Sequence, residues 1–314
     1  MMKNKITVGV LYGGASPEHE VSKMTAKSIL ENIDRAKFGV LEIFIDKDGN
    51  FNHKDLDGVD IAFLAFHGEN CEDGKFQEHL DSKGVKYTGS GAKASRINMN
   101  KDLQKIYFTK AGLKTVKYLI IDGDSSIFEI EKRIVEIIGY PCFIKPVNAG
   151  SSLGISKVSN NSDLKIAIAG ANKINTNIIA EKAVDKPREL EISLVGNRNL
   201  TISNPGEILT NGEFYSYEAK YLKYFPTTSS PKNLSENLSQ KIKDWAKKAY
   251  RITGCRGYAR VDFFLDKKGE LYINEINTLP GFTSIHSVYP KLMIATGISY
   301  KDLITKIIGL GLDA

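Results

Sequence analysis

The segment Arg260–Ser287, which reads RVDFFLDKKGELYINEINTLPGFTSIHS, contains the pattern that decides the fold of the second half of the chain. Two runs of alternating residues, Tyr258–Leu265 and Glu270–Asn277, flank a polar turn that contains one glycine. Alternation on both sides of a short turn is typical of a β-hairpin. The sequence therefore predicts two neighbouring antiparallel strands here.

The polar side chains of this hairpin are expected to lie on one face. Side chains alternate between the faces of a strand, so Arg260 and Asp262 share a face, as do Glu275 and Asn277. A turn centred on its two lysines places Arg260 opposite Glu275 and Asp262 opposite Ile273, within direct or diagonal reach. The alternate positions are mostly apolar and are expected to face a core: Val261, Phe263, Leu265, Tyr272 and Ile276.

Two carboxylates and an amide oxygen on one face suit a hard cation such as Mg²⁺. The alternative is a solvated edge hairpin in which Arg260 and Glu275 form a surface pair. The loop that follows, NTLPGFTS at 277–284, is rich in small and polar residues. Its backbone N–H groups can bind an anionic oxygen, which favours the metal-site interpretation.

The chain has 314 residues, which indicates two or three structural units. Its contents of 42% apolar and 25% charged residues are typical of a soluble globular protein. The net charge of +6 comes from scattered lysines, so we expect no nucleic-acid partner but an anionic small substrate such as a nucleotide. Three cysteines without CxxC spacing indicate reduced thiols in the cytoplasm. The apolar runs are too short to predict a signal peptide or a membrane span.

The first ~90 residues alternate strands, loops and helices, which predicts a parallel, Rossmann-like sheet. Gly13-Gly14 follows the first predicted strand but lacks the full GxGxxG fingerprint, so a dinucleotide site is not expected. Ligands bind at the carboxyl ends of such strands, and Glu18 and His67 both occur there. A structural role for His67 is an equally good interpretation.

A second candidate site surrounds Lys145, which ends an apolar strand and precedes a Gly/Ser loop at 149–154. Small residues let backbone N–H groups approach a phosphate, and lysine supplies a compact positive charge. The alternative is a glycine-rich hairpin whose lysine extends along an apolar surface. Glu181 and Glu189 occur on two later strands, where they could accept hydrogen bonds from ribose or adenine. Solvated strand charges are the simpler interpretation of each.

The segment 211–230 is long, polar and rich in tyrosine, without clear periodicity. Such segments are often lids over active sites. The alternative is a loop that packs through its tyrosine rings.

Six motifs in this order resemble the D-alanine–D-alanine ligases of the ATP-grasp superfamily, over nearly the whole chain. They are GGASPEHEVS (13–22), His-Gly with EDG (67–74), Lys-Pro with GSSLG (145–154), EAKY (218–221), RVD (260–262) and NEINTLPGFTS (274–284).

The resemblance implies an α/β protein with an α+β ATP-grasp part. A Rossmann-like domain is expected over 1–96, a small ATP-grasp lobe over 97–184, and a catalytic lobe over 185–314 with its lid at 211–230. The implied activity is ATP-dependent ligation of two D-alanines for peptidoglycan precursor synthesis. It proceeds through a D-alanyl phosphate and releases ADP and phosphate. The family is commonly dimeric, so the resemblance also implies a homodimer.

The resemblance assigns the nucleotide and metal contacts to three groups of residues. The expected ligands of two Mg²⁺ or Mn²⁺ ions are Asp262, Glu275 and Asn277. The expected phosphate contacts are Lys101, Lys145 and the lid residue Lys220. The expected contacts to adenine and ribose are Glu181, Glu189 and the backbone of Lys182 to Val184.

The same resemblance assigns the two D-alanine subsites. Glu18 is expected to fix the ammonium group of the first D-alanine, in a hydrogen-bonded set with Ser151 and Tyr221, and His67 to lie nearby. The expected oxyanion stabilisers of the tetrahedral step are Arg260 and the Gly281 N–H, and Ser287 is expected to hold the carboxylate of the second D-alanine.

The chain departs from the family pattern at four places. Asn100 replaces the usual aspartate before Lys101, and Cys71 replaces a glycine in the His-Gly loop. The turn 185–187 is one residue longer than usual, and His286 is an unusual neighbour of Ser287.

Three rival functions remain. A D-alanine–D-serine or D-alanine–D-lactate ligase is the nearest, although Tyr221 argues against the lactate type, whose members lack this tyrosine. A NAD-dependent oxidoreductase predicts a GxGxxG loop and a ribose-binding acid that are not clear here. A non-catalytic nucleotide-binding relative is expected to lose the acid–acid–amide set, which is intact.

Overall fold

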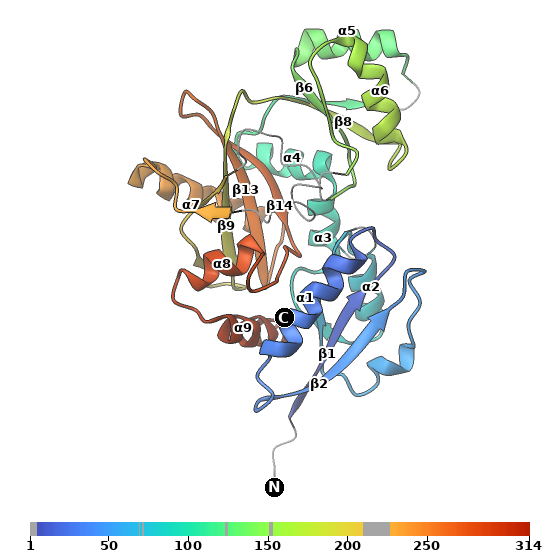
Figure 1. Ribbon diagram of the computed structural model, residues 1–314, viewed down its shortest axis with the longest axis vertical. Helices are drawn as coiled ribbons and strands as arrows, with labels where there is room; N and C mark the ends of the chain where they lie inside the picture. The colour runs from blue at the N-terminus through green and yellow to red at the C-terminus, as the bar shows by residue number, and fades with distance from the viewer. Residues whose placement is uncertain (1–4, 69, 71, 123–124, 151–152, 210–226) are drawn as a thin grey trace.

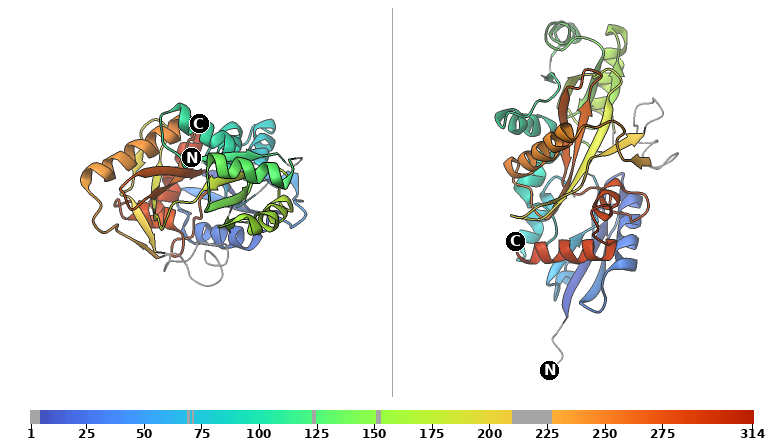
Figure 2. Two further views of the ribbon diagram at one scale, coloured as in Figure 1. Left: turned by 90° about the horizontal axis from the view of Figure 1, so that it is seen from above. Right: turned by 90° about the vertical axis from the view of Figure 1, so that its left-hand side faces the viewer.

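The computed structural model describes residues 5–68, 70, 72–122, 125–150, 153–209 and 227–314. Three sheets follow one another along the longest axis of the molecule (Figures 1 and 2). This mixture of parallel and antiparallel sheets with helices confirms the predicted α/β fold with an α+β part. The predicted division at 1–96, 97–184 and 185–314 stays a prediction.

The N-terminal sheet has the order β2-β1-β3-β4 and all its strands are parallel, as predicted. Its strands are β1 (Ile6–Gly13), β2 (Phe38–Ile45), β3 (Ile61–Leu64) and β4 (Lys86–Tyr87). Its helices are α1 (His19–Asn32), η1 (His53–Leu56), α2 (Lys75–Ser82) and α3 (Ala92–Met99). Most apolar residues of β1 and β3 are buried because helices cover such a sheet, whereas Leu41 and Phe44 of the edge strand β2 are exposed.

The smallest sheet, at the top of Figure 1, is antiparallel with the order β5-β8-β6-β7. Its strands are β5 (Tyr118–Ile121), β6 (Cys142–Pro146), β7 (Ser156–Val158) and β8 (Ile178–Lys182). Helices α5 (Ile127–Ile137) and α6 (Asn161–Asn172) share its core. Ser126 begins α5 with a capping box, because its hydroxyl and the Glu129 carboxylate bind each other's backbone N–H.

The third sheet contains β9, β10, β11, β12, β13 and β14, with β9 between β11 and β13. Their bounds are β9 (Arg188–Val195), β10 (Thr201–Ile202), β11 (Gly206–Leu209), β12 (Thr227–Ser229), β13 (Tyr258–Leu265) and β14 (Leu271–Asn277). Helices α4 (Lys101–Lys110) and α7 (Glu236–Ile252) pack on it, since the apolar stripe of α7 joins the core of β9, β13 and β14.

The predicted hairpin is confirmed as β13 and β14, but its predicted register is wrong. Arg260 lies opposite Asn277 and Asp262 lies opposite Glu275. The pairing then shifts by one residue, so that Asn274 has no partner on β13, as in a β-bulge. The bulge also turns Tyr272 away from the core position that we expected. Its half-buried ring instead lies 5.0 Å from the ammonium of Lys114.

The end of the chain returns to the N-terminal sheet. Helices α8 (Val288–Ile294) and α9 (Tyr300–Leu312) contribute to the same core as β1 and β3. Phe282 lies within this core, with its ring centroid 5.8 Å from Phe63 and 5.6 Å from Tyr300. The two ends of the chain are thus held by one hydrophobic core, just below the hairpin (Figure 1).

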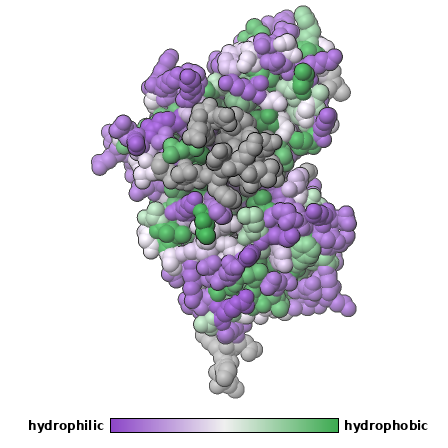
Figure 3. All heavy atoms as spheres, in the orientation of Figure 1, coloured by the Kyte–Doolittle hydropathy of each residue, from purple (hydrophilic) through white to green (hydrophobic). Residues whose placement is uncertain are grey.

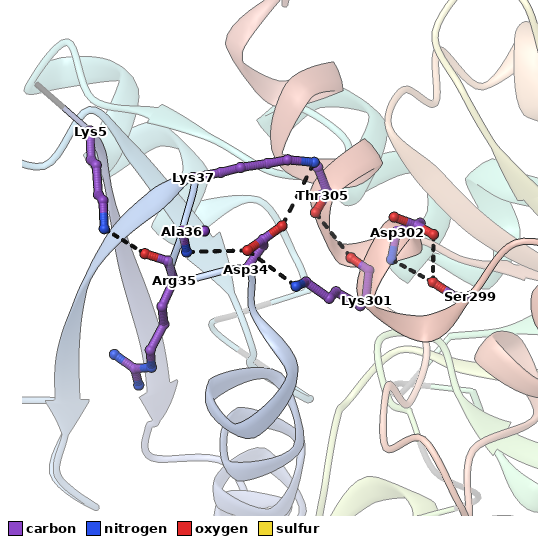
Figure 4. A network of polar contacts seen from close by, with 9 residues as sticks. All are labelled: Lys5, Asp34, Arg35, Ala36, Lys37, Ser299, Lys301, Asp302 and Thr305. Carbon is purple, nitrogen blue, oxygen red and sulfur yellow. Dashed lines mark hydrogen bonds and ion pairs between the residues drawn. The ribbon is translucent and has the colours of Figure 1, made fainter. Parts of the chain in front are cut away.

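A polar network reinforces this contact between α9 and the segment after α1 (Figure 4). Asp34 accepts the Ala36 N–H at 3.2 Å and lies 3.2 Å from the Lys301 ammonium on α9. The hydrogen bond from Lys301 lowers the pKa of Asp34. The network therefore ties the first helix of the chain to the last.

No helix in the described parts of the chain is long and apolar enough to cross a membrane. Hydrophilic and hydrophobic side chains are interspersed on the face drawn in Figure 3. Cys142 and Cys255 are buried free thiols, as expected of reduced cysteines, and Cys71 lies outside the described residues. His79 on α2 is partly buried beside Phe76.

Candidate active site

The polar face of the hairpin brings Arg260, Asp262, Glu275 and Asn277 together. Strand pairing sets Asp262 directly opposite Glu275, and Arg260 directly opposite Asn277. Arg260 donates to both oxygens of Asp262, from Nε at 2.8 Å and from a terminal nitrogen at 2.7 Å. The expected surface pair of Arg260 with Glu275 is therefore replaced by a partly buried pair with Asp262.

Glu191 is a member of this face that the sequence analysis missed. It lies opposite Asp262 on β9, the other neighbour of β13, and its carboxylate is 3.0 Å from Arg260 Nε. Burial would lower the pKa of Arg260, but Asp262 and Glu191 hold it well above its usual range. The signal was present in the alternating run Arg188–Leu194, where Glu191 follows Glu189 at a spacing of two.

The three expected metal ligands offer only oxygen donors, which matches the preference of a hard divalent cation. Asp262 keeps one lone pair on each oxygen after binding Arg260, and Asn277 Oδ1 accepts one bond, from Leu279 N–H at 3.1 Å. No group of three or more His, Cys, Asp or Glu side chains in the described residues could hold a metal ion. A cation here would thus need further oxygens from a ligand, as Mg²⁺ commonly does.

A cluster of lysines surrounds one buried carboxylate between β8, β6 and α4. Lys145 Nζ lies 2.7 Å from one oxygen of Glu181, and Lys105 Nζ lies 3.2 Å from the other. Burial alone would raise the pKa of Glu181, but the two ammonium groups lower it to about 2. Lys145 and Glu181 were predicted, whereas Lys105 was missed because it occupies an ordinary helix position four residues after Lys101.

Lys101 begins α4 beside this cluster, and its ammonium donates to the carbonyl of Ala149 in the Gly/Ser loop. Burial lowers the pKa of Lys101, although Glu275 on the hairpin opposes that effect. Asn100 caps the helix, since its side chain accepts the Leu103 N–H at 2.9 Å. The departure from aspartate at this position therefore retains the capping function.

The expected adenine and ribose contacts lie on neighbouring segments. Lys182 ends β8 and its ammonium donates to the Tyr140 carbonyl at 2.8 Å. Val184 lies in the connection between β8 and β9. Glu189 lies on β9, where it pairs with Phe264 of β13 and Ile208 of β11. The longer turn before Glu189 is held at Asp185, which pairs with Lys267 at 2.7 Å.

The expected subsite of the first D-alanine contains one buried and one partly buried carboxyl group. Glu18, 3% exposed, lies against Gly68, where a Cβ would be 2.9 Å from Glu18 Oε2 and 2.1 Å from a serine hydroxyl. Gly68 has φ +82°, so this approach needs glycine. Glu72, which the sequence analysis did not assign, lies 3.5 Å from His67 Nδ1. Burial and the charge of Glu18 raise the pKa of Glu72, although His67 opposes them.

The other nitrogen of His67 lies 2.8 Å from the hydroxyl of Thr25 on α1. This bond and the Glu72 contact orient the buried ring between a hydroxyl and a carboxylate. The position of His67 is thus compatible with a structural role. It is equally compatible with the expected place near the first D-alanine.

The expected subsite of the second D-alanine is a tight loop before α8. The Ser287 hydroxyl accepts the Thr283 N–H at 2.9 Å, and a Cβ on Gly281 would lie 2.9 Å from Ser287 Oγ. Phe282 follows Gly281 in the chain, and its buried side chain anchors the loop in the core. Gly281 and Ser287 are therefore neighbours, and their roles at this subsite stay predictions. Three expected residues lie outside the described residues: Ser151, Lys220 and Tyr221.

The described chain thus combines a parallel N-terminal sheet with two antiparallel sheets, and the buried Lys145–Glu181 pair lies in the first of these two. Comparison with known proteins shows that this chain belongs to the ligases. Residues 107–309 match the family model described as D-ala D-ala ligase C-terminus, and residues 7–58 match the corresponding N-terminus. The chain belongs to the D-alanine–D-alanine ligase family.

Relatives in this family match nearly the whole chain. The D-alanine--D-alanine ligase of Caldicellulosiruptor bescii is 38% identical over 98% of this chain and 96% of its own length. That of Geobacillus thermodenitrificans is 37% identical over the same shares.

Solved structures have the same fold. The D-alanine-D-alanine ligase from Coxiella burnetii has a TM-score of 0.88 and 28% identity, and the match covers 99% of this chain and 95% of that one. The VanG D-Ala:D-Ser ligase from Enterococcus faecalis has a TM-score of 0.87 and 30% identity, with 98% and 100% covered.

Proposed function

We propose that this protein joins two D-alanines to D-alanyl-D-alanine, with conversion of ATP to ADP and phosphate, for peptidoglycan precursor synthesis. The observation that carries the proposal is the match of residues 107–309 to the ligase family, because this range contains both the Lys145–Glu181 pair and the hairpin. These two groups supply the charges that phosphoryl transfer needs.

In the first step, the carboxylate of one D-alanine attacks the γ-phosphate of ATP, and ADP leaves. Glu18 binds the ammonium group of this D-alanine, with Ser151 and Tyr221 as partners and His67 nearby. Lys101, Lys145 and Lys220 bind the phosphates, while Glu181, Glu189 and the backbone of 182–184 bind the nucleoside. The burial of Glu18 and of the Lys145–Glu181 pair supports these roles, since charges are strongest where water is excluded.

In the second step, the amino group of another D-alanine attacks the acyl phosphate, a tetrahedral intermediate forms, and phosphate leaves. Arg260 and the Gly281 N–H stabilise the oxyanion, and Ser287 binds the carboxylate of this second D-alanine. The short distance between the Gly281 and Ser287 positions supports this division of roles. The two carboxylates around Arg260 keep it charged and fixed.

Asp262, Glu275 and Asn277 would hold Mg²⁺ or Mn²⁺. A bound divalent cation neutralises charge on a phosphoryl group during transfer. The shared face of these side chains and their all-oxygen chemistry support the assignment. We further propose a homodimer, on the strength of the family resemblance alone.

A D-alanine–D-serine ligase is the second candidate, because the VanG D-Ala:D-Ser ligase matches this chain with about the same TM-score and identity as the Coxiella burnetii D-alanine-D-alanine ligase does. Product analysis separates the two. The protein is incubated with ATP, Mg²⁺ and D-alanine, alone and with equal D-serine or D-lactate. We expect D-alanyl-D-alanine as the main product in every mixture. A predominance of the mixed dipeptide or depsipeptide would reject the proposal in favour of the rival.

A further inference from the structure

One buried charge has no role in the proposed reaction. Lys105 lies in the middle of α4 and is only 1% exposed. Its ammonium forms an ion pair with Glu181 at 3.2 Å, and no directed hydrogen bond accompanies it among the described residues. Burial of a lysine ammonium costs free energy unless a partner compensates. The pairing with Glu181 is therefore the reason that this lysine can be charged here.

Glu181 is shared between two lysines that have different tasks. Its other oxygen lies 2.7 Å from Lys145, which the proposed function assigns to the phosphates. When Lys145 turns to a phosphate, Glu181 loses that contact and would be left as a buried carboxylate. Lys105 lies on the opposite oxygen and remains in contact with it. The geometry thus provides one cation for the phosphate and another for the carboxylate.

Three further residues lie near the Lys105–Glu181 pair: Tyr118, Lys101 and Glu275. Tyr118 lies opposite Glu181 on β5 and accepts the Lys105 ammonium over its ring, 5.8 Å from the centroid. Lys101 from α4 adds positive charge. Burial lowers the pKa of both helix lysines, and Glu275 from β14 opposes that effect. Burial lowers the pKa of Lys105, which Glu181 opposes. Lys105 and Lys145 both lower the pKa of Glu181.

We propose that Lys105 is a positioning residue, which holds Glu181 ionised and fixed so that the site selects adenine by its 6-amino group. The inference rests on the proposed ATP-dependent function. An ionised carboxylate only accepts hydrogen bonds, so it accepts from a 6-amino group and repels a 6-oxo group. A neutral or misplaced Glu181 loses that distinction. Lys105 touches neither substrate nor nucleotide in this account.

The test compares ATP with ITP, which carries a 6-oxo group, at saturating D-alanine. We expect Lys105→Met to lower the ATP-over-ITP ratio of kcat/KM by about 10- to 100-fold, the effect of losing one hydrogen bond to a charged group. The loss appears mainly in KM for ATP. Lys105→Arg keeps the charge and should keep most of the preference. Lys110→Met removes an exposed lysine of the same helix and should behave as the unaltered protein.

Three further variants make the result independent of the folding of Lys105→Met. Glu181→Gln should lose the same preference, and the double variant should lose no more than either single one. Lys105→Gln, which is polar but uncharged, should resemble Lys105→Met, and thermal melts identify the folded variants. Retention of the ATP preference by folded Lys105→Met or Lys105→Gln, or by Glu181→Gln, overturns the inference. Absence of ligation by the unaltered protein would instead overturn the proposed function.

Discussion

Arg260 donates two hydrogen bonds to Asp262, which lies two residues further along the same strand. The pair joins a residue proposed for the tetrahedral step to one proposed for phosphoryl transfer. Both side chains are only about 15% exposed, so their charges are weakly screened. The hairpin therefore couples the two halves of the reaction through one ion pair.

Substitution Asp262→Asn should lower kcat by about 10²–10³-fold, the scale of losing one electrostatic contact to the transition state. Asparagine keeps the size but removes the charge that a divalent cation and Arg260 both use. The measurement is phosphate release at saturating ATP and D-alanine. Asp244→Asn, at an exposed position of α7, serves as the matched control. A rate within twofold of the control would refute the metal assignment.

Glu191→Gln should lower kcat by about tenfold and leave KM for ATP nearly unchanged. The reason is that Glu191 acts on Arg260, which is proposed to stabilise a transition state rather than bind nucleotide. Glu207→Gln is the control, because Glu207 also pairs with an arginine in this sheet, Arg188. An increase in KM for ATP without a change in kcat would contradict the proposed role.

Gly281→Ala should lower kcat/KM for D-alanine at the second subsite by at least about tenfold, while the fold is retained. The new methyl group would lie 2.9 Å from Ser287 Oγ and displace the hydroxyl. Gly309→Ala in α9 meets nothing within 4 Å and should raise stability by about 0.5–1 kcal/mol without loss of activity. Equal activity of both variants would argue against the assignment of Ser287.

Glu72→Gln should raise Tm at pH 7 by about 1–3 °C and by less at pH 5. The pKa of Glu72 in the folded protein is raised above its usual 4.5 by burial and by Glu18. The contribution of Glu72 to the free energy of unfolding is thus fully present below pH 4.5, and it is lost as the pH rises through the folded-state pKa. Glutamine has no charge to bury at any pH. A gain at pH 5 as large as that at pH 7 would contradict this explanation.

Phe282→Ala should lower the free energy of unfolding by about 3–5 kcal/mol, the cost of a large cavity in a core. Phe282 is 1% exposed and packs between Phe63 and Tyr289, so it joins the N-terminal core to α8. Denaturant unfolding measures the change. Phe128→Ala, at a phenylalanine that is 75% exposed, should stay within about 0.5 kcal/mol.

The sequence predicted the hairpin and its polar face, because alternation and turn composition are local signals. It did not predict the register, because the bulge depends on a distant contact. The Ile273 N–H donates to the carbonyl of Lys114, in the loop after α4, at 2.9 Å. This bond directs the Ile273 N–H, next to the unpaired Asn274, to a segment outside the hairpin, and it has no signature in the hairpin itself.

The same limit explains the two missed charges. Lys105 lies in a helix whose lysines appear equivalent in sequence, and only its ion pair with Glu181 on β8 distinguishes it from the exposed Lys110. Glu191 lies in an evident alternating strand, but nothing local shows that β13 is its neighbour. Local patterns therefore predicted strands and helices, whereas charge partners required the tertiary structure.

The central claim is that ligation proceeds through a D-alanyl phosphate, and isotope transfer tests it most directly. The protein is incubated with ATP, Mg²⁺ and D-alanine that carries ¹⁸O in its carboxylate. In the proposed reaction, one carboxylate oxygen bridges to phosphorus and leaves with it when the second amino group attacks. We predict one ¹⁸O atom in each released phosphate and one D-alanyl-D-alanine per ATP consumed. Phosphate without ¹⁸O, or ATP hydrolysis without dipeptide, would contradict the account.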